Sequence, residues 1–426
     1  MQDDIAQLLL GSIEADRLAI FTGAGLSMAA PSAVPSAARL AEAIAKKYES
    51  NGALPAGLNR ADLEQVTRLI YANNHSELLL NKIVDWKPFR INPNSGHAAV
   101  ADLLECAAFE YGVTTNYDVL VENAAATLGD PTFRSSIDGV DAEENRGHRP
   151  YVKAHGCCVL NIRQTIWFRE QLTNDPSINV AHERTRNWLR ARMQNKDLLF
   201  VGFWSDWAYL NEVLERLLDV RPMTVIVVDP QDDAALQAKA PRLWQWATSC
   251  ARFEHVAESG ADFLDDLRRR FSIRFLNDMM AFGGTDTFMP TTSTMDATAL
   301  RRDACGVPVG SPLRTKRPDN RMEAIARAHH DLRARGVLLA RDRYELAGKT
   351  IRVVNGGGRM LNTIRAEYND EPPGVREADW VLCAGALDDG GAPPHLLRGT
   401  AAPTLVRPGS TARWVTRTTD IEDLNP

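Results

Sequence analysis

The stretch Leu18-Ala19-Ile20-Phe21-Thr22-Gly23-Ala24-Gly25-Leu26-Ser27 determines the fold that we expect for this chain of 426 residues. Four apolar residues run directly into a glycine turn, which is typical of a buried strand that ends in a tight loop. Further apolar runs, separated by helical patterns, lie at residues 109–115, 152–154, 197–203 and 223–229. Continuous apolar strands that alternate with helices indicate a parallel sheet covered on both faces. The sequence therefore predicts an α/β fold with a Rossmann-like, doubly wound, mostly parallel sheet and helical insertions.

Composition divides the chain into three parts. Residues 1–282 carry the alternation of strands and helices and are expected to form the main domain. Residues 283–318 are crowded with Gly, Pro, Ser and Thr and show no periodicity, which is typical of a linker. Residues 319–426 begin with a basic helical pattern at 320–335, followed by a hairpin pattern at 337–354. This last part predicts a small C-terminal α+β domain with a role in assembly, partner binding or sensing.

The overall charge argues against a dedicated polyanion-binding protein. The formal net charge is -6, with 49 Lys and Arg against 55 Asp and Glu. Residues 301–426 nevertheless hold 20 Lys and Arg against 16 Asp and Glu, so the acidic excess lies in the N-terminal part. The basic stretch at residues 301–352 could contact nucleic acid through its helix and hairpin. The pattern favours a solvated basic face, or an interface with the acidic N-terminal part, over such contact.

Cysteine spacing and the lack of long apolar segments indicate the compartment. The chain has six cysteines, of which only Cys157 and Cys158 are close in sequence, and it lacks the paired CxxC spacing of a zinc site. We therefore expect reduced, mostly buried thiols and no metal ion. The N-terminus lacks the pattern of a signal peptide, and no apolar run approaches the ~20 residues of a membrane helix. The expected location is the cytoplasm, with no membrane contact.

Polar and glycine-rich clusters follow the predicted strands. Ligands of such sheets bind outside the carboxyl ends of the strands, where the chain turns into the helices. The clusters lie at residues 22–27, 115–118, 155–156, 202–206 and 228–230. Because these ends meet at one edge of a parallel sheet, we expect the clusters to form one crevice.

Each cluster taken alone has a functional and a structural explanation. The glycines within residues 22–27 would let the backbone approach a diphosphate, or they could simply form a tight turn. Asn116 and Asp118 could hold ribose hydroxyls or a carboxamide, or they could cap the helix that follows. His155 could act as a general base near neutral pH, or as a hydrogen-bonded structural histidine.

Taken together, the clusters resemble the sirtuin family. The pattern consists of GAGxS at residues 23–27, TxNxD at 114–118, HG at 155–156, GxxSD at 202–206 and an apolar strand that ends in the acidic residue Asp229. The order and the spacing match over residues 15–275. The resemblance does not extend to the C-terminal part.

The resemblance implies that the substrate is NAD and assigns roles to residues of this sequence. The implied NAD-binding residues are Gly23, Ala24, Gly25, Ser27, Thr115, Asn116, Asp118, Gly202, Ser205, Asp206 and Asp229. The implied catalytic residues are Asn116, Asp118 and His155. In this scheme the glycine turn contacts the phosphates, Asn116 and Asp118 position the nicotinamide ribose and its amide, and His155 is the base. The implied lining of the adenosine side is Gly202, Ser205 and Asp229.

Two departures from the protein-deacylating sirtuins bear on the activity. The zinc module with two CxxC pairs is missing after His155, and Ala30–Ser36 stands where those enzymes carry a Pro-Asp-Phe-Arg-type loop. A Pro-Ser in this region and the run Thr114–Asp118 are similar to the sirtuin-like domains of bacterial antiphage defence systems. This resemblance implies an NAD hydrolase that forms nicotinamide and ADP-ribose, with water as the nucleophile. It further implies an abortive-infection effector that depletes NAD.

Two other functions remain open at this point. One is a zinc-less NAD-dependent protein deacylase or ADP-ribosyltransferase, and the other is a non-catalytic module that binds NAD or ADP-ribose and regulates a partner. Asn116 and His155 together argue against pure binding, since a binding module would not need both. The resemblance also implies a homo-oligomer and a partner protein, such as a HerA-type ATPase, an Argonaute or a nucleotide sensor.

Overall fold

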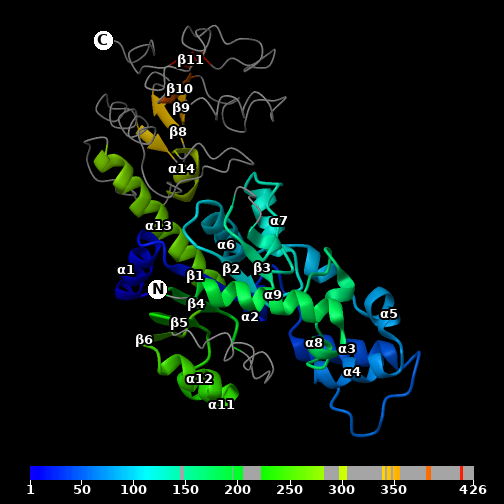
Figure 1. Cartoon of the computed structure of the whole chain (residues 1–426). Coiled ribbons are helices and arrows are strands. Elements are labelled where there is room, and N and C mark those ends of the chain that lie inside the picture. The colour runs from blue at the N-terminus through cyan, green and yellow to red at the C-terminus, as the bar shows by residue number, and fades with distance from the viewer. Residues whose placement is uncertain are drawn as a thin grey trace, which may run out of the picture. The chain divides into compact units, whose positions relative to one another are not determined.

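The computed structural model describes residues 1–143, 148–193, 195–204, 222–282, 297–304, 338–340, 343–346, 349–355, 380–384 and 413–415 (Figure 1). The chain forms two compact units, Met1–Leu267 and Arg268–Pro426, and the division falls inside helix α13 (Gly260–Phe282). Within the predicted linker, Ala297–Ala304 forms helix α14. The domain bounds of 1–282 and 319–426 remain predictions. The predicted helix at 320–335 lies outside the described residues.

The N-terminal unit is built on a six-stranded sheet in the spatial order β3-β2-β1-β4-β5-β6. Its strands are β1 (Leu18–Thr22), β2 (Gly112–Thr114), β3 (Tyr151–Lys153), β4 (Asp197–Val201), β5 (Thr224–Val228) and β6 (Arg252–Val256). Every neighbouring pair is parallel. The strand order reverses between β1 and β4, so the chain winds outward in both directions from β1. This confirms the predicted doubly wound parallel α/β fold.

Strand β6 and helices α11 (Asp233–Lys239) and α12 (Pro241–Thr248) have no counterpart in the sequence prediction. Strand β6 lies at the edge of the sheet, and of its five residues only Val256 is buried. Because an edge strand is covered on fewer sides, its sequence shows no continuous apolar run.

Helices cover the sheet of the N-terminal unit. They include α1 (Asp3–Glu14), α2 (Ala24–Met28), α6 (Ser95–Glu105), α7 (Leu120–Thr127) and α9 (Pro176–Arg192). Phe21 of β1 stacks on Phe200 of β4 with 4.9 Å between the ring centroids. Trp188 of α9 and Leu243 of α12 belong to the same buried cluster, so these two helices pack on one face of the sheet.

A helical insertion, residues 37–90, separates β1 from β2. It consists of α3 (Ala37–Tyr48), α4 (Leu63–Ala72), α5 (Ser76–Leu78), the π-helix η1 (Leu79–Ile83) and the 3-10 helix η2 (Lys87–Arg90), and Figure 1 shows α3, α4 and α5 grouped beside the sheet. The side chains of Ser36 and Asp62 cap α3 and α4. Trp86 packs against Tyr117 and Trp167, with centroid distances of 6.2 and 5.8 Å, and joins the core of the insertion to the segments after β2 and β3.

Three short helices lie in the connections on either side of β3. Helix η3 (Asp141–Glu143) precedes the strand, and η4 (Ile162–Gln164) and α8 (Gln171–Asn174) follow it. The segment that contains η4 and α8 takes the place in the chain where the zinc module of a deacylating sirtuin would be expected.

The C-terminal unit contains a second sheet in the order β11-β10-β9-β8-β7. Its strands are β7 (Leu338–Ala340), β8 (Arg343–Leu346), β9 (Lys349–Asn355), β10 (Trp380–Ala384) and β11 (Arg413–Val415). Strands β7, β8 and β9 pair antiparallel, in agreement with the predicted hairpin, whereas β9, β10 and β11 pair parallel. In the same unit, Arg301 of α14 is buried and donates to Ser272 Oγ of α13 at 2.9 Å.

None of the helices in the described ranges is long and apolar enough to cross a membrane. Within the same ranges, Cys106, Cys157, Cys158 and Cys250 are buried and form no disulfide.

Candidate functional site

A cleft of about 720 Å³ opens at the carboxyl ends of the central strands of the N-terminal unit. Of the predicted site residues, those that line it are Ala24, Gly25, Ser27, Thr115, Asn116, Asp118, His155, Gly202 and Asp229. Ser205 and Asp206 lie outside the described residues. The structure thus brings predicted residues from the ends of β1 to β5 into one cavity.

The glycine turn after β1 is pressed against the end of β4. The Gly25 N–H donates to the Gly202 carbonyl oxygen at 2.9 Å. A Cβ atom on Gly25 would lie 2.7 Å from Gly202 Cα, and one on Gly23 would lie 2.6 Å from Phe203 Cα. Gly202 has φ +58°, and a Cβ there would lie 2.4 Å from Leu26 N. These glycines are therefore required by the contact of two backbone turns, a reason that the sequence prediction did not contain.

Four side chains, called the Ser27 cluster below, meet behind this turn: Ser27, His97, Asn116 and Asp118. Ser27 Oγ donates to Asp118 Oδ2 at 2.8 Å and accepts from Asn116 Nδ2 at 2.9 Å. The ring nitrogen His97 Nε2 lies 3.1 Å from the same hydroxyl. Because a hydroxyl has one hydrogen to donate and two lone pairs, these three contacts use its full capacity. Ser27 is the centre that fixes the other three side chains.

His97 is a residue of this cluster that the sequence prediction missed. Its Nδ1 accepts from the Asn94 main-chain N–H at 3.2 Å. The proton of the neutral ring therefore resides on Nε2, which donates to Ser27. Burial lowers the pKa of His97 to about 4, although Asp118 acts in the opposite direction, so the ring is neutral near pH 7. A signal was present in the sequence, since Asn94 and His97 form the capping box of α6.

The Asn116 side chain is held in one orientation. Its Nδ2 donates to the Gly23 carbonyl oxygen at 3.0 Å as well as to Ser27 Oγ. Its main-chain N–H donates to Thr114 Oγ1 at 3.1 Å. Because both amide hydrogens are directed at protein atoms, the carboxamide oxygen is the group left to accept a hydrogen bond from a ligand or a water.

Asp118 has two roles in the structure. One carboxylate oxygen, Oδ2, accepts from Ser27, and the other, Oδ1, accepts from the N–H of Leu120 at 3.2 Å. Leu120 is the first residue of α7, so Asp118 binds the first N–H of this helix from one position before the N-cap residue Val119, which has no side-chain cap. The carboxylate is 4% exposed and lies at the wall of the cleft.

His155 lies on the other side of the cleft, in the turn after β3. Its main-chain oxygen accepts from Ile166 N at 3.0 Å. The next residue, Gly156, has φ +87°, and a Cβ there would lie 2.7 Å from the Gln164 carbonyl oxygen, so the turn is packed tightly against the segment that follows. Burial, with a smaller contribution from His182, lowers the pKa of His155 to about 3. The ring is therefore neutral near pH 7.

The far end of the cleft is formed by β5 and by residues outside the predicted set. Asp229 follows β5, is largely buried and accepts from Gln231 N at 3.0 Å through Oδ1. Lys239 of α11 and the Ser259–Gly260 pair also line this end. A carboxylate at this position can accept hydrogen bonds from ribose hydroxyls.

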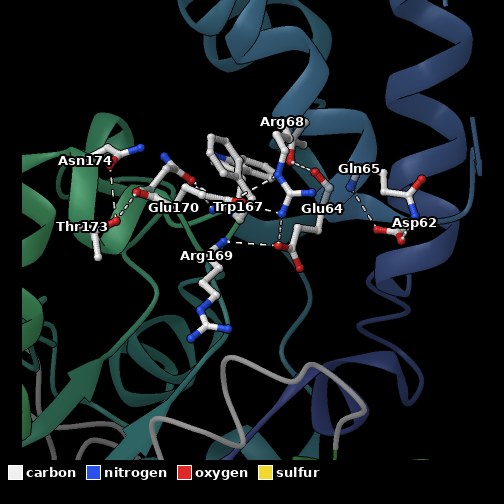
Figure 2. Close-up of polar contacts among 12 residues, drawn as sticks. Asp62, Glu64, Gln65, Arg68, Trp167, Arg169, Glu170, Thr173 and Asn174 are labelled. Carbon is white, nitrogen blue, oxygen red and sulfur yellow. Dashed lines mark hydrogen bonds and ion pairs between the residues drawn. The ribbon is translucent and has the colours of Figure 1, made fainter. Parts of the chain in front are cut away.

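The helical insertion supplies an apolar side of the cleft that the sequence prediction also missed. Leu40, Leu63 and Phe89 of the insertion line it, together with Val34 from the segment just before the insertion. The insertion is tied by polar contacts to the segment that follows His155, as Figure 2 shows for the edge of α4. There Arg68 binds Glu64 of its own helix and Glu170, whose carboxylate lies 3.0 Å from the guanidinium.

No group of three or more His, Cys, Asp or Glu side chains is placed to hold a metal ion in the part of the chain that the structure describes.

Comparison with known proteins identifies part of the chain. Residues 112–252 match the family model described as SIR2-like domain, so the chain contains a SIR2-like domain. The matched range begins at β2 and ends at the first residue of β6, and it does not include the glycine turn after β1. No curated protein sequence matches the chain.

The chain is also similar to solved structures. One is a crystal structure of a Sir2 homologue in complex with NAD, with 14% identity, a TM-score of 0.32 and coverage of 63% of this chain and 92% of that chain. Another is described as the structural basis for the mechanism and regulation of Sir2 enzymes, with 16% identity, a TM-score of 0.35 and coverage of 63% and 96%.

Proposed function

We propose that this chain, which contains a SIR2-like domain, is an NAD hydrolase. It binds NAD in the cleft of the N-terminal unit and transfers the ADP-ribose group to water, which yields nicotinamide and ADP-ribose. The observation that carries this proposal is the meeting of the Ser27 cluster and a neutral His155 in one cleft at the carboxyl ends of parallel strands. The strand order reverses there, which is where open α/β sheets bind nucleotides.

The residues present fit NAD. The cleft volume of about 720 Å³ lies within the range of ordinary small-molecule sites. The Asn116 carboxamide oxygen would accept from a ribose hydroxyl or from the attacking water. Asp229 would accept from the hydroxyls of the adenosine ribose. The apolar side formed by the helical insertion would exclude bulk water from the reacting centre.

The reaction makes two demands on the site. The positive charge that develops on the ribose must be stabilised, and one proton must be removed from the attacking water. As the bond between C1′ and the nicotinamide nitrogen breaks, its electron pair leaves with nicotinamide, and positive charge develops on the ribose ring. The Asp118 carboxylate, held by Ser27, would stabilise that charge. Water would then attack C1′, and the neutral imidazole of His155 would take the proton that the water loses.

We propose an abortive-infection role in bacterial antiphage defence, as the sequence resemblance implies. The chain would act in the cytoplasm as a homo-oligomer, under the control of a partner protein such as a HerA-type ATPase, an Argonaute or a nucleotide sensor.

The test is release of nicotinamide and ADP-ribose from NAD by the purified full chain, with His155→Ala alongside. Release by the wild type and a loss of about 10²–10⁴-fold in the variant are expected. If the purified protein releases no nicotinamide, the assay is repeated with extract from phage-infected bacteria, which would supply a missing activator. If no nicotinamide is released with extract although NAD binding is measurable, hydrolysis is rejected and the non-catalytic NAD-binding module is supported. Deacylation of an acyl-lysine peptide in place of NAD hydrolysis would support the deacylase alternative.

A further inference from the structure

Lys153, the last residue of β3, is a buried cation beside the cleft that none of the roles above uses. It is 1% exposed, a degree of burial that lysine rarely reaches without a partner. It is two residues before His155, yet it does not belong to the lining of the cleft. Its function is therefore to be sought in the groups that it contacts.

The Lys153 ammonium joins two different elements. It donates to the main-chain carbonyl oxygen of Asp118, and it lies 3.3 Å from the carboxylate of Glu122 on α7. Burial alone would lower the pKa of Lys153, but the field of Glu122 and of weaker neighbours outweighs burial and raises the pKa above its ordinary value. The side chain is therefore charged under all ordinary conditions, and the bond to Asp118 is charge-assisted.

The segment that Lys153 holds contains candidate catalytic residues but no regular structure. Residues 115–119 lie between the end of β2 and the start of α7. In this segment the Tyr117 carbonyl accepts from Cys158 N at 2.8 Å, and the Asp118 carbonyl accepts from Lys153 Nζ. The two donors lie on either side of His155: Lys153 ends β3, and Cys158 belongs to the segment that follows the strand. A buried carbonyl that loses its donor is left unsatisfied at a cost in free energy, so the segment has a strong preference for this position.

We infer that Lys153 is a positioning residue of the cleft, whose ammonium fixes the Asp118 carbonyl and so aligns Asn116 and Asp118 with Ser27. The role rests on the proposed function, because it concerns the reaction that these side chains carry out. Lys153 touches neither substrate nor reacting atoms and acts through the main chain of residues 115–119. A displacement of about 1 Å at such a site is enough to lower turnover by about 10²-fold.

The variants must separate positioning from stability. Lys153→Met alone leaves the half-buried carboxylate of Glu122 without its cation and with Ser135 Oγ as its donor, which endangers folding. The combination of Lys153→Met with Glu122→Gln removes both charges together, a change that folded proteins often tolerate. Glu122→Gln alone is the matched control, since it keeps the bond from Lys153 to the Asp118 carbonyl. Because it leaves the buried ammonium without its counter-ion, its free energy of unfolding is measured together with its kcat. Lys153→Arg keeps a charged donor and serves as the conservative rescue.

The kinetic test is nicotinamide release by the full chain under the conditions in which the wild type is active. The double variant is expected to lose about 10²-fold in kcat with little change in KM, because the contacts at the adenosine end are untouched. Glu122→Gln and Lys153→Arg are expected to keep most of kcat. Equal kcat in the double variant and in Glu122→Gln would overturn the inference and leave Lys153 as part of a structural ion pair.

A second readout does not depend on activity. His97 Nε2 donates to Ser27, so the ¹⁵N resonances of the His97 ring report the geometry of the Ser27 cluster in ¹⁵N-histidine-labelled protein. The double variant is expected to shift these resonances, whereas Glu122→Gln leaves them in place. Unshifted resonances in the folded double variant would overturn the inference. If the wild type releases no nicotinamide, the proposed function fails while this measurement still decides the role of Lys153.

Discussion

His97 and His155 are both buried beside the cleft, but different forces fix their surroundings. The His97 ring is bound to Ser27 Oγ at 3.1 Å and to Asn94 N at 3.2 Å. The main chain of His155 is fixed by Ile166 N and by the tight packing of the turn that follows it. We call the glycine turn with the Ser27 cluster the polar wall, and residues 153–168 the His155 wall. The polar wall is organised by a closed set of side-chain hydrogen bonds around Ser27, whereas the turn at His155 is held by one main-chain hydrogen bond and by the close packing of Gly156.

This difference has a consequence for experiments. A wall built from interlocking hydrogen bonds loses its geometry when one bonding group is removed, since each buried partner is then left unsatisfied. A packed wall responds to changes in volume and tolerates the loss of polar groups at its edge.

The largest effect is expected from Asn116→Ala in the polar wall. The substitution removes the carboxamide oxygen offered to the substrate, and it leaves Ser27 Oγ without one of its donors. Loss of a preorganised hydrogen-bonding group in an active site typically costs about 10²–10³ in kcat. The measurement is nicotinamide release at saturating NAD, with the free energy of unfolding determined in parallel.

Asn123→Ala is the matched control for this substitution. Asn123 lies on α7, is half-buried and donates to the Arg90 carbonyl oxygen, away from the lining of the cleft. Its removal is expected to leave kcat unchanged. Wild-type turnover in Asn116→Ala would contradict both the hydrolase mechanism and the description of the polar wall as a closed set.

The next effect concerns the backbone contact on which the polar wall rests. Gly25→Ala would place a Cβ 2.7 Å from Gly202 Cα, a distance that backbone atoms cannot accommodate without a shift. Overpacking of this kind costs about 1–3 kcal/mol. Urea unfolding without NAD is therefore expected to show a destabilised protein. If the glycine served only the approach of a diphosphate, stability without ligand would not change.

Gly11→Ala is the control for this measurement. Gly11 lies within α1, and a Cβ there would meet nothing within 4 Å. Alanine is a better helix former than glycine, so this variant is expected to be more stable by about 0.5–1 kcal/mol. If the free energy of unfolding falls in Gly25→Ala and rises in Gly11→Ala, close backbone packing at Gly25 is distinguished from the general conformational freedom of glycine.

The sequence predicts the central strands correctly because their signal is local. Strands β1, β4 and β5 are continuous apolar runs, and such runs require burial on both faces. Strand β6 carries no such run because it lies at the edge of the sheet, where partial burial suffices. The contribution of the helical insertion to the cleft depends on packing between Trp86 and Trp167, which are distant in sequence. No local pattern encodes that contact.

The same distinction applies to the site. Strand-end clusters predict which polar residues gather in one cleft, since parallel strands bring their carboxyl ends together. The bond between Ser27 and His97 joins residues 70 positions apart, and its consequences for the proton on the His97 ring follow only from the fold. The role of Lys153 escapes a sequence pattern for another reason: it acts on a main-chain carbonyl, which carries no side-chain signature.

A third prediction uses pH to compare the two histidines. Burial lowers the pKa of His97 to about 4 and that of His155 to about 3, whereas an unfolded histidine titrates near 6.5. As the pH falls below 6.5, the unfolded chain binds protons that the folded chain does not, so the free energy of unfolding falls. Each histidine contributes about 1.4 kcal/mol per pH unit once its unfolded form is protonated. This contribution ends near the folded pKa.

His97→Gln should remove the contribution of one histidine from the pH dependence of the free energy of unfolding. The glutamine amide can still donate toward Ser27, so the variant is designed to fold. The measurement is urea unfolding of both proteins at several pH values between 7 and 5. Equal pH dependence in the variant and the wild type would show that His97 is not a buried neutral group, and the assigned proton on Nε2 would be wrong.

The smallest effect is expected at the outer edge of the His155 wall, where Arg68 binds Glu64 and Glu170 (Figure 2). The Arg68 side chain is 43% exposed, and its guanidinium lies 5.9 Å from the centre of the Phe168 ring. Exposed ion pairs contribute about 0–1 kcal/mol. Arg68→Ala should therefore lower the free energy of unfolding by no more than about 1 kcal/mol and leave kcat unchanged.

Arg68→Lys sharpens this last test, because it keeps the charge but loses the planar group that reaches Glu64 and Glu170 together. If packing holds the His155 wall, both substitutions leave turnover at the wild-type level, whatever their small effects on stability. If Arg68→Ala lowers kcat while the protein stays folded and Arg68→Lys restores it, the position of His155 depends on charge at the edge of the wall. The two walls would then be organised by polar contacts alike, and the contrast between them would be wrong.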